Sequence, residues 1–181
     1  MTGSSRWVSV SKPYVVPRPP GAGDAWSEEA ARRGGQGGQR LREVAELVPP
    51  PRVAQALGLA DGASAVVRRR TILFDGQPVE LADSYYPAAL ASGTGLAEPA
   101  SIPGGAVTLL AELGHVPSRA SEEVSARPAN GVERHLLDLA DGEWVLELFR
   151  RLTTAAGTPV EVSVLTMVAR GRTLGYELSI D

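Results

Sequence analysis

The sequence predicts an α+β domain in which helices pack on an antiparallel β-sheet. Three observations support this fold class. Segments with the period-two alternation of strands recur at short intervals along the chain. Glycine-containing turns at 75–76 and 156–157 join four of these segments into two hairpins. Short apolar segments that begin at proline or end at glycine, as helices do, lie between them.

The first half of the body is expected to contain a strand, a helix and a hairpin. Residues 39–47 alternate loosely, which indicates a strand. A helix follows at 49–59, because consecutive prolines suit a helix start and Gly58 suits its end. Strands at 65–73 and 77–86 flank the Asp-Gly turn.

The second half is expected to contain two helices and four strands. Its predicted elements are a short apolar helix at 106–113 ended by Gly114, a strand at 118–126, a helix at 132–139 with Leu136, Leu137 and Leu139 inward, strands at 144–154 and 159–169, and a last strand at 174–180.

Residues 1–38 are expected to form an arm that precedes a body at 39–181. Four prolines disfavour both helix and central strand there, and the glycines of 34–38 form a flexible break. A short helix at 24–33 fits between them, with Asp24 or Ser27 as its cap. Three large aromatic residues are too apolar for a solvated tail, so at least one should dock on the body or on a partner chain. They are Trp7, Tyr14 and Trp26.

A weak internal repeat relates residues 69–80 to residues 150–161. In each copy a strand with paired arginines turns at glycine and returns through Pro-Val-Glu, ending at Glu80 or Glu161. Two such hairpins suggest a pseudo-twofold antiparallel sheet with helices on one face. A ligand pocket would then lie on the other face, or in the mouth between the halves.

Composition excludes several classes of function. The 181 residues of this 19.0 kDa chain carry a net charge of −3 and no cysteine, and only two are histidines. This composition excludes disulfides, thiolate nucleophiles, iron–sulfur clusters and a histidine-rich metal site. It also disfavours binding to the phosphate backbone of nucleic acids. No apolar run reaches the about 18 residues of a membrane helix, and the N-terminus lacks a signal-peptide pattern, so we expect a cytoplasmic protein.

Catalytic and cofactor motifs are also missing. The sequence has no P-loop and no dinucleotide fingerprint, so no cofactor is expected. His115 follows a helix-ending glycine and His135 lies on a polar helix face, which favours surface positions over a catalytic triad.

The run Arg68-Arg69-Arg70 allows two interpretations. Alternation places Arg68 and Arg70 on one face of a strand and Arg69 on the other. In the first interpretation, Arg68 and Arg70 are solvated and flank a buried Arg69 that has a carboxylate partner. In the second, one of the arginines points into a cleft and anchors an anionic ligand. The repeat-related Glu80 and Glu161 could either pair with these arginines or bind ligand hydroxyls.

Two further segments are candidates for a pocket. Tyr85 and Tyr86 alternate faces, so only one of them should enter the core or the pocket. The glycine-rich loop at 102–106 leaves backbone amides free to approach a ligand.

At these residues the sequence resembles the UTRA domain, the effector-binding domain of the HutC-type branch of GntR transcriptional regulators. The resemblance covers roughly residues 39–180 and implies a chorismate lyase-like fold, an antiparallel sheet with helices around a ligand cleft. It rests on an ordered set of motifs: Val-Val-Arg-Arg-Arg70, Phe-Asp75-Gly76-Gln-Pro78-Val, Ser84-Tyr85-Tyr86-Pro87, Gly-Gly-Ala-Val-Thr-Leu-Leu-Ala-Glu-Leu-Gly114 and Gly157-Thr-Pro159-Val-Glu161.

The resemblance also implies partners. In this family a winged helix–turn–helix precedes the domain, whereas residues 1–38 look like the linker between the two units. We therefore expect a cut-down or stand-alone sensor domain that forms a homodimer. It would act on DNA only indirectly, through a separate DNA-binding unit.

The resemblance places a ligand site at nine positions. Arg70 matches the first arginine of an Arg-x-Arg pair and Glu161 is retained, while several polar family positions are apolar here. The ligand implied is a less charged, more hydrophobic small molecule, with one carboxylate for Arg70. The positions are Arg70, Ile72, Ala82, Ser84, Tyr86, Gly105, Val107, Glu161 and Met167, with no catalytic residue and no metal.

Three functions are open from the sequence. The first is an effector-sensing domain that works by population shift. The second is a lyase acting on an aromatic carboxylate, with Arg70 as the carboxylate anchor and Glu161 as the acid. The third is a stand-alone dimerisation module that modulates a full-length regulator.

Overall fold

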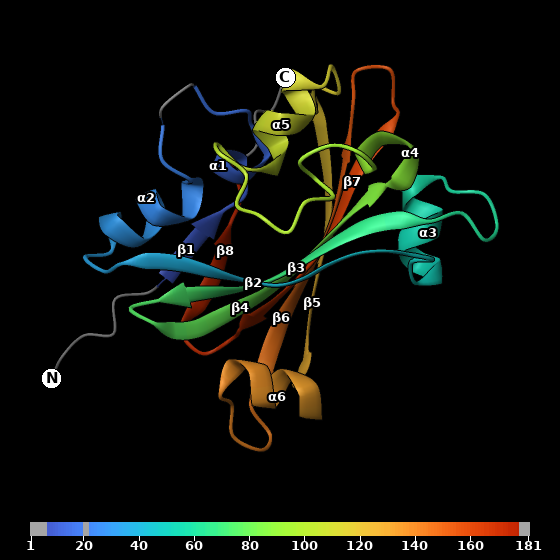
Figure 1. Cartoon of the computed structure of the whole chain (residues 1–181). Helices are drawn as coiled ribbons and strands as arrows, with labels where there is room; N and C mark the ends of the chain where they lie inside the picture. Colours follow the sequence, from blue (N-terminus) through green and yellow to red (C-terminus); the bar gives the residue numbers. More distant parts are fainter. Residues whose placement is uncertain (1–6, 20–21, 178–181) are drawn as a thin grey trace, which may run out of the picture.

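The computed structural model describes residues 7–19 and 22–177 (Figure 1). A six-stranded antiparallel sheet in the order β2-β3-β4-β7-β6-β5 forms its centre, and a parallel pair, β1-β8, stands beside it. In chain order the elements are β1 (Trp7–Val10), α1 (Lys12–Val15), α2 (Ala25–Arg32), β2 (Gly37–Leu47), α3 (Pro51–Leu57), β3 (Ala65–Phe74), β4 (Gln77–Pro87), α4 (Ala88–Ala91), α5 (Ala106–Glu112), β5 (Arg119–Pro128), α6 (Gly131–Leu137), β6 (Trp144–Thr153), β7 (Pro159–Val168) and β8 (Arg172–Gly175).

The predicted α+β fold and the predicted strands and helices of the body are confirmed, with shifts of a few residues at their ends. The sequence missed β1, α1 and α4, which are only four residues long each. The expected glycine break is partly wrong, because Gly37 and Gly38 already belong to β2. The expected strand 174–180 overlaps β8 at 174–175 and is wrong at 176–177, which are not strand, while 178–180 lie outside the described residues.

The internal repeat is a structural repeat. β2-α3-β3-β4 and β5-α6-β6-β7 have the same order of elements, and β4 pairs with β7 at the centre of the sheet. Asp83 lies opposite Val164 and Ser84 opposite Ser163, so the two hairpins meet about a pseudo-twofold axis. This arrangement confirms the pseudo-twofold sheet predicted from the paired arginines and glycine turns.

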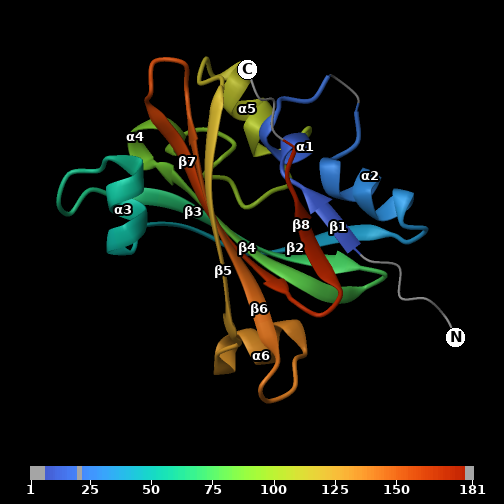
Figure 2. The ribbon, with the colours of Figure 1, turned by 180° about the vertical axis from the view of Figure 1, so that it is seen from behind.

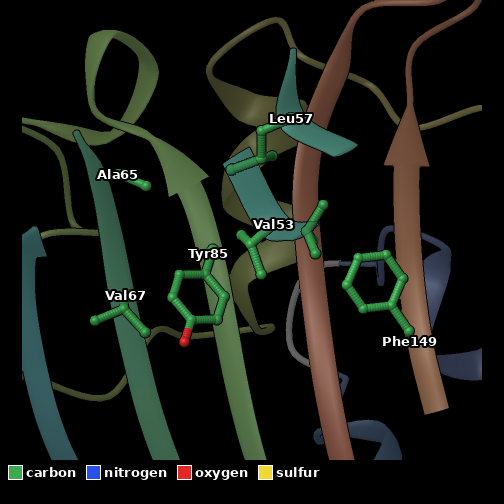
Figure 3. Close-up of a cluster of buried hydrophobic side chains, with 7 residues drawn as sticks. Val53, Leu57, Ala65, Val67, Tyr85 and Phe149 are labelled. Atoms are coloured by element: carbon green, nitrogen blue, oxygen red, sulfur yellow. The ribbon is translucent and has the colours of Figure 1, made fainter. Parts of the chain in front are cut away.

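Helices cover both faces of the sheet, although the sequence predicted them on one face. On one face α3 packs its Val53 and Leu57 against Tyr85 and Phe149, the cluster drawn in Figure 3. On the opposite face α4 and α5 cover Tyr86, and α2 covers Ile72 and Ala82. Figures 1 and 2 show α1, α2 and α5 gathered beside the β1–β8 pair, with α3 and α6 set apart from them.

The arm docks on the body, which confirms the expectation from its aromatic residues. Trp26 of α2 is 8% exposed and donates from Nε1 to the carbonyl of Leu73 at 2.9 Å. Trp7 and Tyr14 pack against the same cluster. Asp24 caps α2, and Gly37 allows the close approach of this helix, since a Cβ there would lie 2.9 Å from the Trp26 Nε1 atom.

The repeat offers a matched pair of helix ends for a stability test. α3 ends at Gly58 and α6 ends at Asp138, both in the left-handed conformation, with φ of 66° and 53°. A residue with a Cβ is strained there, so Asp138→Gly is expected to stabilise the domain by about 0.5–1 kcal/mol. Gly58→Ala should destabilise it by about 1 kcal/mol. Urea denaturation measures both, and a destabilised Asp138→Gly variant would contradict the argument.

Candidate functional site

A cavity of about 340 Å³ opens on the sheet face opposite α3 and α6. All nine residues selected from the sequence line it, from three neighbouring strands and from the loop before α5. They are Arg70 and Ile72 of β3, Ala82, Ser84 and Tyr86 of β4, Glu161 and Met167 of β7, and Gly105 and Val107 at the start of α5.

Strand alternation explains why these positions converge. Residues two apart on β4 and on β7 point to the same face, so Ala82, Ser84 and Tyr86 share the cavity face. The centre of the floor is fixed by Ser84 and Ser163, whose hydroxyl oxygens are 2.8 Å apart. Ser163 also donates to Glu161 Oε1 at 2.6 Å.

The opposite wall comes from the N-terminal arm, which sequence reasoning did not place at the site. Residues 9–11, 13–14, 16 and 18 of the arm line the cavity together with residues 24–26 and Glu29 around α2. The buried Glu29 accepts hydrogen bonds from Trp7 Nε1 (2.7 Å), Ser9 Oγ (2.9 Å) and Tyr14 Oη (2.6 Å), which tie β1 and α1 to α2. The three aromatic residues of the arm were the signal that could have pointed to this wall.

Two ion pairs neutralise buried charges at and beside the cavity. Arg172 Nη2 and Glu80 Oε2 are 2.9 Å apart, and their side chains are 2% and 16% exposed. Arg150 Nε and Glu122 Oε1 are 2.6 Å apart, and both side chains are less than a tenth exposed. Burial raises the pKa of the Glu80 carboxyl although Arg172 acts in the opposite direction.

Arg70 and Glu161 line the cavity without an ionic partner in the described part of the chain. They differ from Glu29 and Asp24, which also lack an ionic partner but accept several hydrogen bonds. Arg70 makes only long contacts to neutral groups, Gln39 Oε1 at 3.4 Å and Ser84 Oγ at 3.3 Å, and its Nε has no hydrogen-bond partner. Glu161 is 7% exposed, and its Oε2 atom accepts no hydrogen bond. Arg70 Nε and Glu161 Oε2 are buried atoms without a hydrogen-bond partner, which is unfavourable, so both groups are available to a ligand that supplies the missing partners.

The arginine run follows neither of its two interpretations completely. Arg70 lines the cavity, as the ligand-anchor interpretation requires. The solvated-pair interpretation is wrong for Arg68, which is 5% exposed and bonds to backbone carbonyls. Arg69 does have carboxylate partners, Asp83 at 3.2 Å and Glu43, but its side chain is 26% exposed rather than buried.

The two tyrosines lie on opposite faces, as alternation predicts. The expectation that only one enters the core or the pocket is wrong, because both faces are covered: Tyr85 is 4% and Tyr86 is 1% exposed. Tyr85 packs under α3, whereas Tyr86 faces the cavity. Burial, together with the nearby Glu161 carboxylate, raises the pKa of the Tyr86 phenol, so this group is a neutral hydroxyl at physiological pH.

The two histidines lie away from this cavity. His135 is exposed and His115 is half-buried, and neither lines the cavity. Among residues 7–19 and 22–177, no group of three or more His, Asp or Glu side chains could hold a metal ion. In the same residues no helix is both long and apolar enough to span a membrane.

A pseudo-symmetric α+β sheet with a covered cavity on one face defines a small-molecule-binding domain. The sequence profile of the UTRA domain matches residues 32–170. The chain therefore belongs to the UTRA domain family.

One curated relative is described as a transcriptional regulator. The chain is 35% identical over 129 residues to an HTH-type transcriptional regulator of Streptomyces coelicolor, an alignment that covers 70% of this chain and 48% of the relative. The chain thus spans about half the length of this curated relative.

Solved structures share the fold. One protein assigned to the GntR family of transcriptional regulators superposes with a TM-score of 0.78 at 23% identity, over 91% of this chain and 67% of that one. The effector domain of PhnF from Mycobacterium smegmatis gives 0.73 at 19% identity, over 91% and 99%. These matches do not favour the lyase or the stand-alone dimerisation module.

Proposed function

We propose that this chain is the small-molecule effector-sensing domain of a GntR/HutC-type transcriptional regulator and has no catalytic role. The observation that carries the proposal is a cavity whose sheet face presents Arg70 and Glu161, each with a buried side-chain atom that has no hydrogen-bond partner. The family membership and the regulator relative support it. Control of DNA binding would pass through a separate DNA-binding unit, in the cytoplasm.

The effector fits best as a small, weakly charged molecule that carries one carboxylate. Arg70 offers a guanidinium for that carboxylate, because its present contacts are long and uncharged. Glu161 Oε2 accepts no hydrogen bond, so it could accept one from a hydroxyl or ammonium group of the ligand. The register of β3, β4 and β7 places Ser84 and Ser163 between these two groups. Ala82 beside Arg70, and Ile72 and Met167 beyond it, add apolar surface to the cavity. A ligand with a carboxylate, a hydroxyl or ammonium donor and a small apolar part meets all three requirements.

The arm provides a physical route from effector to DNA-binding unit. We propose residues 1–38 as the linker and residues 39–181 as the ligand-binding domain. Arm residues such as Ser11 and Tyr14 line the cavity. Ligand binding and docking of the arm are therefore thermodynamically coupled, so each changes the equilibrium of the other. An effector would shift the populations of the different arm positions. In a homodimer this shift would change how the two DNA-binding units are placed relative to each other.

Thermal unfolding against a panel of metabolites tests the proposal. The panel pairs each hydroxy or amino carboxylic acid with an analogue lacking the carboxylate and another lacking the donor. A true effector at a hundred times its Kd stabilises the folded state by about 2.7 kcal/mol, and neither matched analogue should do so. A broad panel in which no compound raises the melting temperature would argue against a sensor.

A further inference from the structure

Arg68 places a buried guanidinium under the loop that joins α4 to α5. It lies next to Arg70 on β3 but is not among the residues that line the cavity. Its Nη1 atom donates to the carbonyls of Leu96 (3.0 Å) and Glu98 (2.6 Å), with a longer contact to Gly95 (3.4 Å). Its Nη2 atom donates to the carbonyl of Ala100 at 2.6 Å. One side chain thus binds four carbonyl oxygens of an irregular loop.

The segment 98–101 has few other attachments. It is exposed and has no regular secondary structure. Within the described residues, the hydrogen bonds that its backbone receives come from Arg68. Upstream, Leu96 is fully buried against the sheet, and downstream Gly105 donates to the carbonyl of Ile102. Arg68 therefore bridges the gap between two anchored ends.

The same loop continues directly into the cavity wall. Residues 101–107 line the cavity, and the last residue that Arg68 holds is Ala100. The position of that wall depends on where the loop leaves the sheet.

A buried cation without a carboxylate partner is costly unless it is fully hydrogen-bonded. Arg68 takes part in no ion pair within the described residues, and its hydrogen-bond partners are carbonyl oxygens instead. The guanidinium has several donors in one plane, which lets it reach three or four carbonyls of a curved loop at once, whereas a lysine ammonium donates from one point.

We propose that Arg68 is a positioning residue that fixes the 95–100 loop to the sheet and thereby sets the wall of the cavity formed by residues 101–107. It contacts no ligand. Its effect on the site does not depend on which effector binds.

Limited proteolysis of the full chain tests this role. Elastase cleaves after small residues, and Ala97 and Ala100 lie within the loop. In Arg68→Met, cleavage after these residues is expected to rise about tenfold or more, because cleavage follows the open population and several charge-assisted hydrogen bonds are lost. Arg69→Met is the matched control, since it removes an arginine from the same strand on the other face. Fragment masses identify the bond that is cut.

The outcomes decide between positioning and general destabilisation. The proposal expects faster cleavage in the loop only, no change in Arg69→Met, and an intermediate rate in Arg68→Lys. A wild-type cleavage rate in folded Arg68→Met would overturn it, and so would an equal rise at sites throughout the sheet. If circular dichroism finds Arg68→Met unfolded, Arg68→Lys decides, and an unchanged loop in that variant rejects the proposal.

Discussion

Replacing Arg172 by methionine is expected to destabilise the domain by about 3–5 kcal/mol, because it leaves Glu80 in the interior without its ionic partner. The arginine also stacks on the Trp7 ring at 3.9 Å and contacts Ser9, so the variant loses part of the attachment of β1. Chemical denaturation at pH 7 gives the loss directly.

The pH dependence of this loss identifies its cause. Burial already raises the pKa of the Glu80 carboxyl, and without Arg172 the pKa should rise further. A group with a raised pKa favours the folded state when protonated. The deficit of Arg172→Met should therefore be smallest below the unfolded-state pKa of about 4.3 and complete above the raised pKa.

A double variant provides the control. Arg172→Met combined with Glu80→Gln removes both charges and should recover part of the stability at pH 7. A deficit that is the same at every pH, and in the double variant, would assign the loss to the Trp7 packing instead.

Replacing Arg70 by methionine is expected to abolish effector binding, with at least about a hundredfold rise in Kd, since a buried carboxylate of the ligand would lose its charged partner. The unliganded domain should lose little stability, because Arg70 makes only two long contacts to neutral groups. Isothermal titration with any compound identified by thermal unfolding measures the change in affinity.

Two matched variants define the specificity of that result. Arg69→Met changes the neighbouring arginine, which points to the opposite face, and should leave Kd unaltered. Glu161→Gln should weaken ligands that carry an ammonium more than those that carry a hydroxyl. If Arg70→Met still bound the ligand tightly, Arg70 would not be a ligand contact.

Local signals carried most of the prediction of the fold. Alternation, the turn at Asp75-Gly76 and the helix end at Gly58 each act over a few residues, so the sequence predicted the elements of both hairpins within small shifts. The arm was harder, since β1 pairs with β8, about the whole length of the chain away. A four-residue strand has too weak a local pattern to be predicted by itself.

The sequence by itself determined which residues share a strand face, because side-chain alternation is a property of the backbone. That property, with the family resemblance, was enough to select nine positions that line one cavity. Only the tertiary structure decided how charges are matched: Glu80 meets Arg172, Arg68 meets the loop carbonyls, and Arg70 and Glu161 meet no opposite charge in the described chain. Ion pairs between distant segments depend on how those segments are placed in space, and no local pattern of residues encodes that placement.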